Sequence, residues 1–370
     1  MDGGDRILVA AGLTAAVVVG AFVLWGPGGA PKVRKRRGQI AGLQNLGRTC
    51  FLNTLLQALA ACPTFIDWLK KYAKADGHNS MITTLYTVIE VVNGTHESAR
   101  GTPVCPLGVL QALRGAGWVV PADQQDAHEL LHVLLSCVEE ETAAMAKKVY
   151  NFYFHFSFVH MVIVTLSKNK RNTCLDSQSP VRYDKFDSVT LSMANATVGR
   201  SGSYSLSGKL YICIHIDDTF RSLPACLVLH IARVEWRGGG PAKRGDHVAF
   251  GETLSMAPYA QQHVVTVETF HLTPYSSQSL SVLAAAEAPE RALYRLAAVV
   301  VHVGGPRSGH FATYRRGNGF ETKRWWYTSD TLVHEVSLQE VLRCAAYMLF
   351  YERTAEQLYL KNKIELLKAK

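Results

Sequence analysis

GLQNLGRTCFLN, residues 42–53, places Cys50 directly after a glycine turn and directly before an apolar helical pattern. A thiol in that position meets the positive end of a helix dipole, which favours the thiolate, the nucleophilic form of cysteine. The stretch therefore predicts a helix that opens on a reactive cysteine, and with it the part of the fold that carries chemistry.

The complementary groups come much later in the chain. SGHFATYRR (308–316) offers His310 as a base, and WWYTSD (325–330) offers Ser329 and Asp330 as groups that could orient its imidazole. A cysteine, a histidine and a polar orienter are the parts of a cysteine hydrolase. The sequence leaves open which of Ser329 and Asp330 has the orienting role.

Size and composition describe a protein that folds. The chain has 370 residues, enough for a membrane segment plus one large catalytic domain, or for two modest domains. Hydrophobic residues make up 48% and charged residues 19%, which is typical of a globular protein rather than a disordered one.

The cysteines and glycines limit the function further. The eight cysteines are scattered without a CxxC pair, which argues for a reducing compartment and against a disulfide framework or a complete structural zinc site. No glycine-rich nucleotide loop is present. We therefore expect neither a cofactor nor a metal.

An apolar segment near the N-terminus predicts a membrane anchor. Residues 7–25 contain no charge, and a helix of that length spans about 28 Å, one hydrocarbon core. Trp25 stands where an interfacial aromatic is expected. A secretory signal peptide is the main rival, but it requires a positive cluster before the apolar run, and here the cluster follows it.

The net charge of +9 has its densest block in KVRKRR, residues 32–37, directly after the apolar segment. This position favours a membrane-flank role over a nuclear-localisation or nucleic-acid role, so we expect no nucleic-acid partner. The positive-inside rule puts the domain that follows in the cytosol. A short, mildly apolar anchor with a basic C-terminal flank suits the mitochondrial outer membrane.

The periodicity changes along the rest of the chain, from helical to extended. Apolar residues at helical spacing, followed by β-branched and aromatic runs, predict an α+β fold with a helical lobe before a sheet lobe, as in papain. The stretch 151–166 has no clear period: a buried strand or a pair of strands, an interfacial element, and sequence outside a well-packed domain all remain open. The expected helices are 51–72, broken at Pro63, then 81–92, 106–117 and 123–141, and the expected strands are 209–216, 225–236, 247–256, 262–272, 293–305, 309–316 and 323–330, with a short helix and a strand in 337–353.

Several of these blocks carry a family signature. GLQNLGRTCFLNTLLQAL (42–59) resembles the cysteine box of the ubiquitin-specific proteases. GGPRSGHFATYRR (304–316) with WWYTSDTLV (325–333) resembles their histidine box, and QQDAHELLHVLL (124–135) resembles an intervening box. The resemblance covers about 40–353 and implies a helical thumb, a β-rich palm and fingers.

The resemblance implies a role for each residue of the candidate catalytic set. Cys50 would attack the carbonyl of the C-terminal glycine of ubiquitin, and His310 would take the thiol proton and later protonate the leaving lysine amine. Ser329 would complete a Cys-His-Ser triad, and the adjacent Asp330 could substitute for it. Asn45 matches the oxyanion donor of the family, which is worth on the order of 3 kcal/mol in comparable enzymes.

The substrate-binding residues are implied in the same way. Asp126 and Glu129 are three positions apart and share a helix face, and in the family such acids hold the arginines of the ubiquitin tail. Gln124 lies beside them in sequence, and Tyr314 of the histidine box completes the set. The alternative for the two acids is a helix N-terminus stabilised by negative charge. The expected partners are ubiquitin, ubiquitinated membrane proteins and, through 7–25, the lipid bilayer.

The chain also departs from the family pattern. Family members usually carry a zinc ribbon with two CxxC pairs in the fingers, whereas Cys174 lacks a partner two residues on and no second pair occurs between 190 and 225. The fingers are therefore expected to be reduced and metal-free, or truncated. Arg48 stands where asparagine is common.

Three functions compete at this point. The first is a membrane-anchored cysteine isopeptidase that removes ubiquitin from mitochondrial outer-membrane proteins and opposes mitophagy, as a resembling family member does. The second is a weak or inactive relative that tethers ubiquitinated proteins to the membrane. The third, a papain-like protease for ordinary peptides, is disfavoured by the acidic pair. The expected organisation is a short tail on the intermembrane-space side (1–6), an anchor (7–25), a basic linker (26–39), a catalytic domain (40–353) and a C-terminal tail (354–370).

Overall fold

The computed structural model describes most of the expected catalytic domain. The expected anchor (7–25), the linker up to residue 37 and the tail beyond Thr354 lie outside the described residues. Within the described part of the chain, no single helix is long and apolar enough to cross a membrane. The described residues are 38–73, 80–99, 101–119, 125–149, 164–168, 182–186, 188–193, 204–206, 218–259, 292–306 and 308–354.

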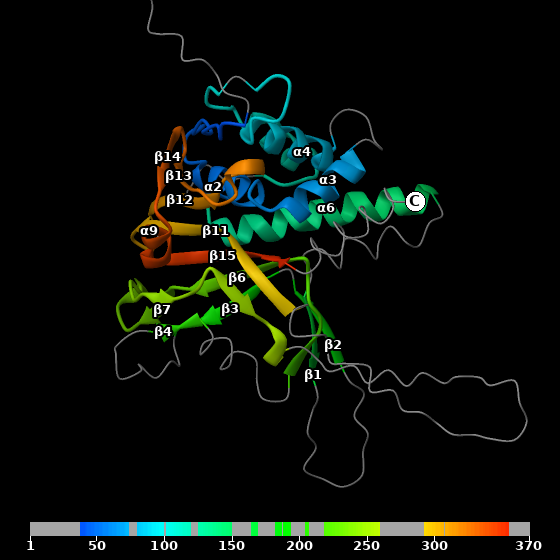
Figure 1. Ribbon diagram of the computed structural model, residues 1–370. Helices are drawn as coiled ribbons and strands as arrows, with labels where there is room; N and C mark the ends of the chain where they lie inside the picture. Colours follow the sequence, from blue (N-terminus) through cyan, green and yellow to red (C-terminus); the bar gives the residue numbers. More distant parts are fainter. Residues whose placement is uncertain are drawn as a thin grey trace, which may run out of the picture. The chain divides into compact units, whose positions relative to one another are not determined.

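The N-terminal part of the domain is helical, as the periodicity predicts. The helices are α2 (Cys50–Leu59), α3 (Pro63–Ala73), α4 (Met81–Val92), α5 (Leu107–Gly115) and α6 (Ala127–Val149). Every residue of α2 is buried, so this helix forms the centre of the helical layer (Figure 1). The predicted break at Pro63 is confirmed, because α2 ends and α3 begins there.

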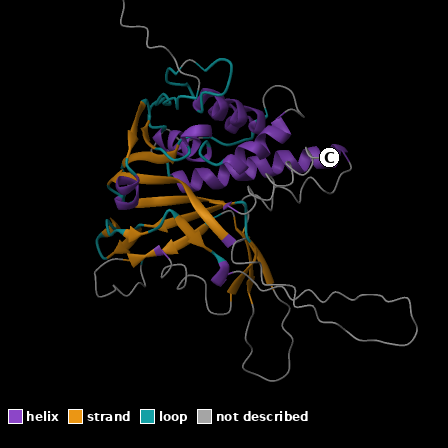
Figure 2. Cartoon of the chain, in the orientation of Figure 1, coloured by secondary structure: helices purple, strands orange, loops and turns teal. Residues whose placement is uncertain are grey.

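The later part of the chain forms a sheet of eight strands, whose main path runs β14-β13-β12-β11-β15-β6-β3, with β10 paired to β11. Figure 2 shows helices α2 to α6 gathered on one side of these strands. All pairs are antiparallel except β3 with β6, so this is a mixed sheet. The strands are β3 (Val189–Ser192), β6 (Cys226–Ala232), β10 (Thr253–Ser255), β11 (Leu293–Gly304), β12 (Gly309–Arg316), β13 (Trp325–Ser329), β14 (Leu332–Val336) and β15 (Ala346–Arg353).

The remaining elements are short. Helix α9 (Leu338–Arg343) precedes β15, which confirms the helix and strand expected in 337–353. The expected strands 209–216 and 262–272 lie outside the described residues, and so does most of 151–166. Smaller sheets are formed by β1 (Val164–Lys168), β2 (Arg182–Phe186) and β5 (Asp218–Ser222), by β4 (Tyr204–Ser205) with β9 (Val248–Ala249), and by β7 (Val234–Arg237) with β8 (Gly240–Lys243).

The central strands bury both of their faces. On β11, Val300 joins the hydrophobic cluster beneath the helices, while Val299 and Val301 join a second cluster on the other face. This follows from the alternation of side chains along a strand, and it explains why residues 296–301 in the middle of β11 are a continuous apolar run.

Helix α2 is fixed to strand β12 by polar contacts inside the core. The hydroxyls of Thr54 and Thr313 lie 2.5 Å apart, and the Thr313 hydroxyl also donates to the carbonyl oxygen of Thr54 at 2.8 Å. Because buried polar groups are costly unless paired, these bonds specify one alignment of helix and strand. Cys50 lies one turn before Thr54, and His310 lies three residues before Thr313. The same alignment of helix and strand therefore determines the positions of Cys50 and His310.

A buried arginine makes several polar contacts of the same kind between helices and sheet. Arg315 is fully buried and donates hydrogen bonds to Gln57 Oε1 (2.9 Å), the Ala60 carbonyl (2.8 Å), Asn93 Oδ1 (2.7 Å) and Asn318 Oδ1 (3.0 Å). Burial lowers its pKa to about 9, because desolvation disfavours the charged form. One guanidinium thus joins α2, α4 and the end of β12.

Candidate active site

Cys50 is buried and is the first residue of α2, as the sequence predicts. The loop before it lies against the turn that follows β13. The Leu43 N–H donates to the Asp330 carbonyl at 2.8 Å. A Cβ on Gly42 would lie only 2.6 Å from the Thr331 carbonyl oxygen, so the position accepts only glycine. The cysteine loop and the end of β13 are therefore held together by their backbones.

His310 lies at the start of β12, and its Nε2 is 2.7 Å from the Ser329 hydroxyl. This contact leaves Nδ1 as the ring nitrogen that can receive a proton from a thiol. The residue before it must be glycine, because a Cβ on Gly309 would lie 2.4 Å from His302 Nε2. Burial lowers the pKa of His302 to about 4, with the nearby Lys243 as a smaller cause, so this second histidine stays neutral.

Asp330 has a different set of partners from Ser329. Its Oδ2 accepts from Asn45 Nδ2 at 2.9 Å, and its Oδ1 accepts from Asn53 Nδ2 at 2.8 Å. Its backbone adopts the left-handed conformation, with a φ of 50°. The sequence could not choose between Ser329 and Asp330, and the structure gives them different partners. Ser329 contacts the imidazole of His310, and Asp330 accepts hydrogen bonds from two amides.

Asn45 is held from both ends of its side chain. Its Oδ1 accepts the Thr49 N–H at 3.0 Å while its Nδ2 donates to Asp330. An amide nitrogen carries two hydrogens, and these contacts use one of them. The second can stabilise a developing oxyanion beside Cys50. Asn53, which shares the same carboxylate, was missed by the sequence analysis, although it follows Cys50 by three residues and so falls on the same side of the helix.

Asp126 caps helix α6, so the helix begins at Ala127 rather than at residue 123. Its Oδ1 accepts the His128 N–H at 2.6 Å, and its Oδ2 accepts the Tyr347 hydroxyl at 2.5 Å. Burial and the carboxylate raise the pKa of Tyr347. The helix-terminus interpretation therefore holds for Asp126, while Glu129 is exposed about one turn on. Their role in ubiquitin binding stays a prediction.

No described contact brings the two other expected substrate-binding residues, Gln124 and Tyr314, next to Asp126 and Glu129. Gln124 lies outside the described residues. Tyr314 packs its ring against Tyr327, with centroids 5.0 Å apart, and its hydroxyl donates to Glu340 of α9 at 3.3 Å. Burial raises the pKa of Tyr314.

A histidine cluster near Asp126 was also missed. His128 Nε2 lies 2.7 Å from the Ser188 hydroxyl and 3.1 Å from His132 Nε2, and the His128 ring stacks on His230 with centroids 3.8 Å apart. Burial, reinforced by the two neighbouring histidines, lowers the pKa of His230 to about 3. The four-residue spacing of His128 and His132 on a helix was the available signal.

Comparison with known proteins places this geometry in a family. The family model described as ubiquitin carboxyl-terminal hydrolase matches residues 41–351. The chain belongs to the ubiquitin carboxyl-terminal hydrolase family. Membership confirms the expected family and enzyme class, a ubiquitinyl hydrolase.

Individual relatives cover nearly the whole chain. Ubiquitin carboxyl-terminal hydrolase 30 of Homo sapiens is 30% identical over 95% of this chain and 91% of its own length, and the Rattus norvegicus protein of the same name is 30% identical over 93% and 90%. The solved SAGA module Ubp8/Sgf11/Sus1/Sgf73 bound to ubiquitin aldehyde aligns with a TM-score of 0.61 at 19% identity, covering 92% of this chain and 75% of that one. The likeness confirms the papain-like α+β fold of the ubiquitin hydrolases, with its thumb of helices and palm of strands.

Proposed function

We propose that the protein is a membrane-anchored deubiquitinase, which hydrolyses isopeptide bonds at the ubiquitin C-terminus on mitochondrial outer-membrane proteins and so opposes mitophagy. The catalytic part of this proposal rests on two adjacent side-chain contacts. Asp330 accepts a hydrogen bond from Asn45, and its neighbour Ser329 lies within hydrogen-bond distance of His310. The location is supported by the apolar segment 7–25 and by the similarity to ubiquitin carboxyl-terminal hydrolase 30.

The reaction starts with transfer of the Cys50 proton to His310 Nδ1, while Ser329 holds the imidazole through Nε2. The thiolate attacks the carbonyl carbon of the terminal glycine of ubiquitin. Negative charge then develops on the carbonyl oxygen, where it accepts hydrogen bonds from the Asn45 amide and the Cys50 N–H. His310 protonates the departing lysine amine, and water, deprotonated by the same imidazole, hydrolyses the thioester.

The use of serine as orienter has a chemical consequence. A hydroxyl fixes the ring by a neutral hydrogen bond, whereas a carboxylate would also stabilise the imidazolium by its charge. In this chain the carboxylate of the next residue, Asp330, is occupied by two amides. We therefore assign orientation of His310 to Ser329 and construction of the oxyanion site to Asp330.

The ubiquitin tail is proposed to bind beside the start of α6. Glu129 is exposed and Asp126 is half-buried, so both carboxylates are accessible in part to a basic peptide. Because Asp126 also caps α6 and accepts from Tyr347, Asp126→Asn should disturb local structure as well as binding. Glu129→Gln is the cleaner test, and it should raise KM for ubiquitin substrates with little change in kcat.

The test of the enzyme is a ubiquitin probe with a C-terminal electrophile, applied to the wild type, Cys50→Ala and Cys105→Ala. Cys105 is exposed, which makes it the matched control for indiscriminate thiol labelling. We expect a covalent adduct in the wild type and in Cys105→Ala and none in Cys50→Ala. No adduct from folded wild type would sink the enzyme proposal in favour of a ubiquitin-binding tether.

The location is tested separately, by comparing the full chain with a variant that lacks residues 1–38. The full chain should remain with mitochondrial membranes after alkaline carbonate extraction, and the shortened one should be released. External protease should remove the catalytic domain from intact mitochondria, since it faces the cytosol. Release of the full chain by carbonate would rule out an integral anchor without bearing on the catalytic residues.

A further inference from the structure

Three metal-ligating side chains meet at the end of β12 that is remote from His310. The sulfur atoms of Cys62 and Cys226 lie 3.8 Å apart, and these sulfurs and a carboxylate oxygen of Glu352 all lie within 4.8 Å of one another. All three residues are buried. Cys62 directly precedes α3, while Cys226 and Glu352 are opposite each other in the β6–β15 ladder. The group therefore bridges the helical thumb and the palm sheet.

We propose that Cys62, Cys226 and Glu352 form a binding site for a thiolate-preferring divalent cation of the zinc class. With a zinc–sulfur bond of about 2.3 Å, two sulfurs 3.8 Å apart enclose an angle of about 110° at the ion, close to the tetrahedral value. Two thiolates and a carboxylate are ligand types that zinc takes. The site is distinct from the zinc ribbon of the family, because it lies in the seam between thumb and palm.

The carboxylate is oriented as a metal ligand should be. Glu352 Oε1 accepts the Thr64 hydroxyl at 2.7 Å, and Oε2 accepts the Thr64 N–H at 3.3 Å. Such outer hydrogen bonds fix the direction of ligating carboxylates in protein metal sites.

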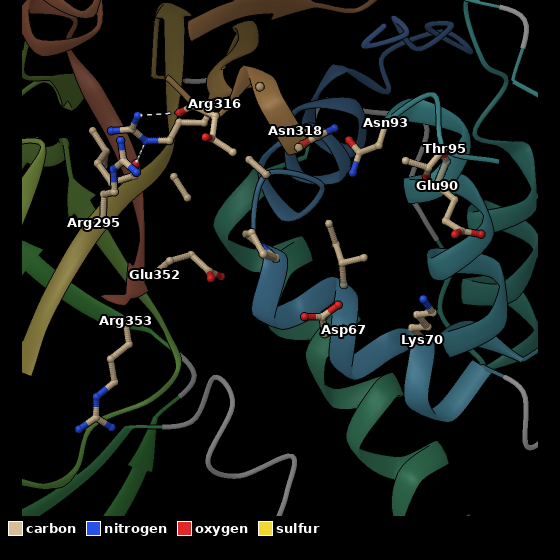
Figure 3. Close-up of a pocket in the computed structure, with 18 of the residues that line it drawn as sticks. Asp67, Lys70, Glu90, Asn93, Thr95, Arg295, Arg316, Asn318, Glu352 and Arg353 are labelled. Carbon is tan, nitrogen blue, oxygen red and sulfur yellow. Dashed lines mark hydrogen bonds between the residues drawn. The ribbon is translucent and has the colours of Figure 1, made fainter. Parts of the chain in front are cut away.

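A cavity borders the group at Glu352, which lines it. Its volume is about 700 Å³, and it lies between α3 and α4 on one side and the ends of β11, β12 and β15 on the other. Figure 3 shows Glu352 reaching into it from the strand side, with Asp67 and Lys70 of α3 opposite. An ion could reach the group past Glu352, and a water molecule in the cavity could fill a fourth coordination position, for which the described residues offer no further ligand.

The charges balance when the ion binds. Binding releases two thiol protons, and the ion with two thiolates and one carboxylate has a net charge of −1. The buried Arg315 guanidinium, which interacts electrostatically with Cys62, supplies +1. The ion binds thiolates and not thiols, so metal affinity in such a site depends on pH. Affinity should therefore rise with pH.

The test uses the full chain carrying Cys50→Ser, which keeps the reactive thiol out of the measurement, reduced and stripped of metal. Cobalt(II) is titrated as a spectroscopic probe, since it gives thiolate charge-transfer bands and the visible bands of tetrahedral coordination. We expect these bands to saturate at one equivalent. Adding Cys226→Ser should abolish them, and adding Cys137→Ser, which removes a buried thiol outside the group, should leave them unchanged.

Two results would overturn the site. One is the lack of thiolate bands in the folded parent protein. The other is survival of the bands in Cys226→Ser together with their loss in Cys174→Ser, which would assign the ion to another part of the chain. Circular dichroism checks that each variant is folded. If Cys226→Ser does not fold, Glu352→Gln, which keeps the shape of the side chain, should weaken cobalt binding at least tenfold.

Zinc itself provides a second readout that does not depend on catalysis. An ion that binds only the folded state raises the melting temperature by mass action. Zinc should stabilise the Cys50→Ser parent and its Cys137→Ser derivative, and the shift should be lost in Glu352→Gln. An equal shift in all three proteins would place the stabilising ion elsewhere and overturn the proposal.

Discussion

The two ends of strand β12 both join the helical half of the domain to the sheet, but they do so with different chemistry. At one end, His310 and Ser329 are half-buried and Asn45 is exposed, and each makes one to three hydrogen bonds. At the other end, Arg315 is fully buried and bonded to four residues of the surrounding elements.

The difference separates reactivity from stability within one strand. His310 must reach the substrate to move protons, so it gives up burial together with Ser329 and Asn45 and loses much of the stabilisation that burial brings, whereas Cys50 stays buried. The remote end has no such constraint, and its buried polar network determines how α2 lies on β12. Substitutions at the first end should therefore alter rate, and substitutions at the second should alter the free energy of unfolding.

The largest effect is expected for His310→Ala. Loss of the base should lower kcat/KM for a ubiquitin amide by about 10⁴-fold or more, while the free energy of unfolding changes by about 0.5 kcal/mol or less. Steady-state kinetics and urea unfolding measure the two quantities. His334→Ala, an exposed histidine on β14, is the matched control and should keep the wild-type rate. Retention of activity in His310→Ala would point to His302 as the base.

The opposite pattern is expected for Arg315→Met. Removing the guanidinium leaves buried acceptors on Gln57 and Asn93, and a half-buried one on Asn318, without their donor, so the free energy of unfolding should fall by about 3 kcal/mol or more. Urea unfolding measures the loss. At temperatures where the variant is folded, kcat should stay within about threefold of the wild type. Arg324→Met removes an exposed cation and should cost about 0.5 kcal/mol or less.

A change in stability of less than 1 kcal/mol in Arg315→Met would contradict the proposed division between the two ends. A large loss of kcat in the folded variant would contradict it as well, because it would show that the buried network also determines the geometry of the reacting groups.

An intermediate effect is expected at the oxyanion site. Asn45→Ala should lower kcat by about 10²- to 10³-fold, the range for loss of one oxyanion donor. Asp330→Asn removes one of two acceptors and should have a smaller effect, about tenfold. If Asp330 acts through the Asn45 amide, the double variant should be no slower than Asn45→Ala alone. Fully multiplicative effects would show that Asp330 acts by another route.

The smallest effect concerns the dependence of stability on pH. His230 is neutral in the folded protein, with a pKa lowered to about 3, whereas an unfolded histidine titrates near 6.5. Between these values the unfolded state binds more protons, so the free energy of unfolding should fall as pH is lowered, by up to about 1.4 kcal/mol per pH unit for each such histidine. Urea unfolding at several pH values between 4 and 7 measures this slope.

His230→Phe should reduce the slope by about one proton, and the exposed His334→Phe should leave it unchanged. An unaltered slope in His230→Phe would show that His230 takes up its proton equally in both states.

Sequence reasoning succeeded where the chemistry is local. Cys50 at a helix start and His310 at a strand start follow from short motifs and periodicity, and both are where they were expected. It could not decide between Ser329 and Asp330, because Ser329 ends strand β13 while Asp330 lies in the turn after it, and their partners depend on how the cysteine loop packs against that turn. That information lies in Asn45 and in the backbone of the loop.

The proposed metal-binding group at the other end of β12 could not be predicted from the spacing of its residues in the sequence. Metal ligands are read from sequence when they are close together, and on that ground we expected no metal. Cys62 and Cys226 are 164 positions apart, and it is the antiparallel pairing of β6 with β15 and the packing of α3 that bring Cys62, Cys226 and Glu352 together. Long-range convergence of this kind depends on topology rather than on a motif.

The left-handed backbone of Asp330 determines which residues the position can accept. Among non-glycine residues, asparagine and aspartate tolerate a positive φ best. Two amides, those of Asn45 and Asn53, donate to the same side chain, and only a carboxylate presents two acceptors and no donor. Glycine would satisfy the backbone but not the amides, and asparagine would satisfy the backbone and one amide. A library randomised at position 330 and selected for ubiquitin cleavage should therefore return aspartate first, asparagine as a weak second, and almost nothing else.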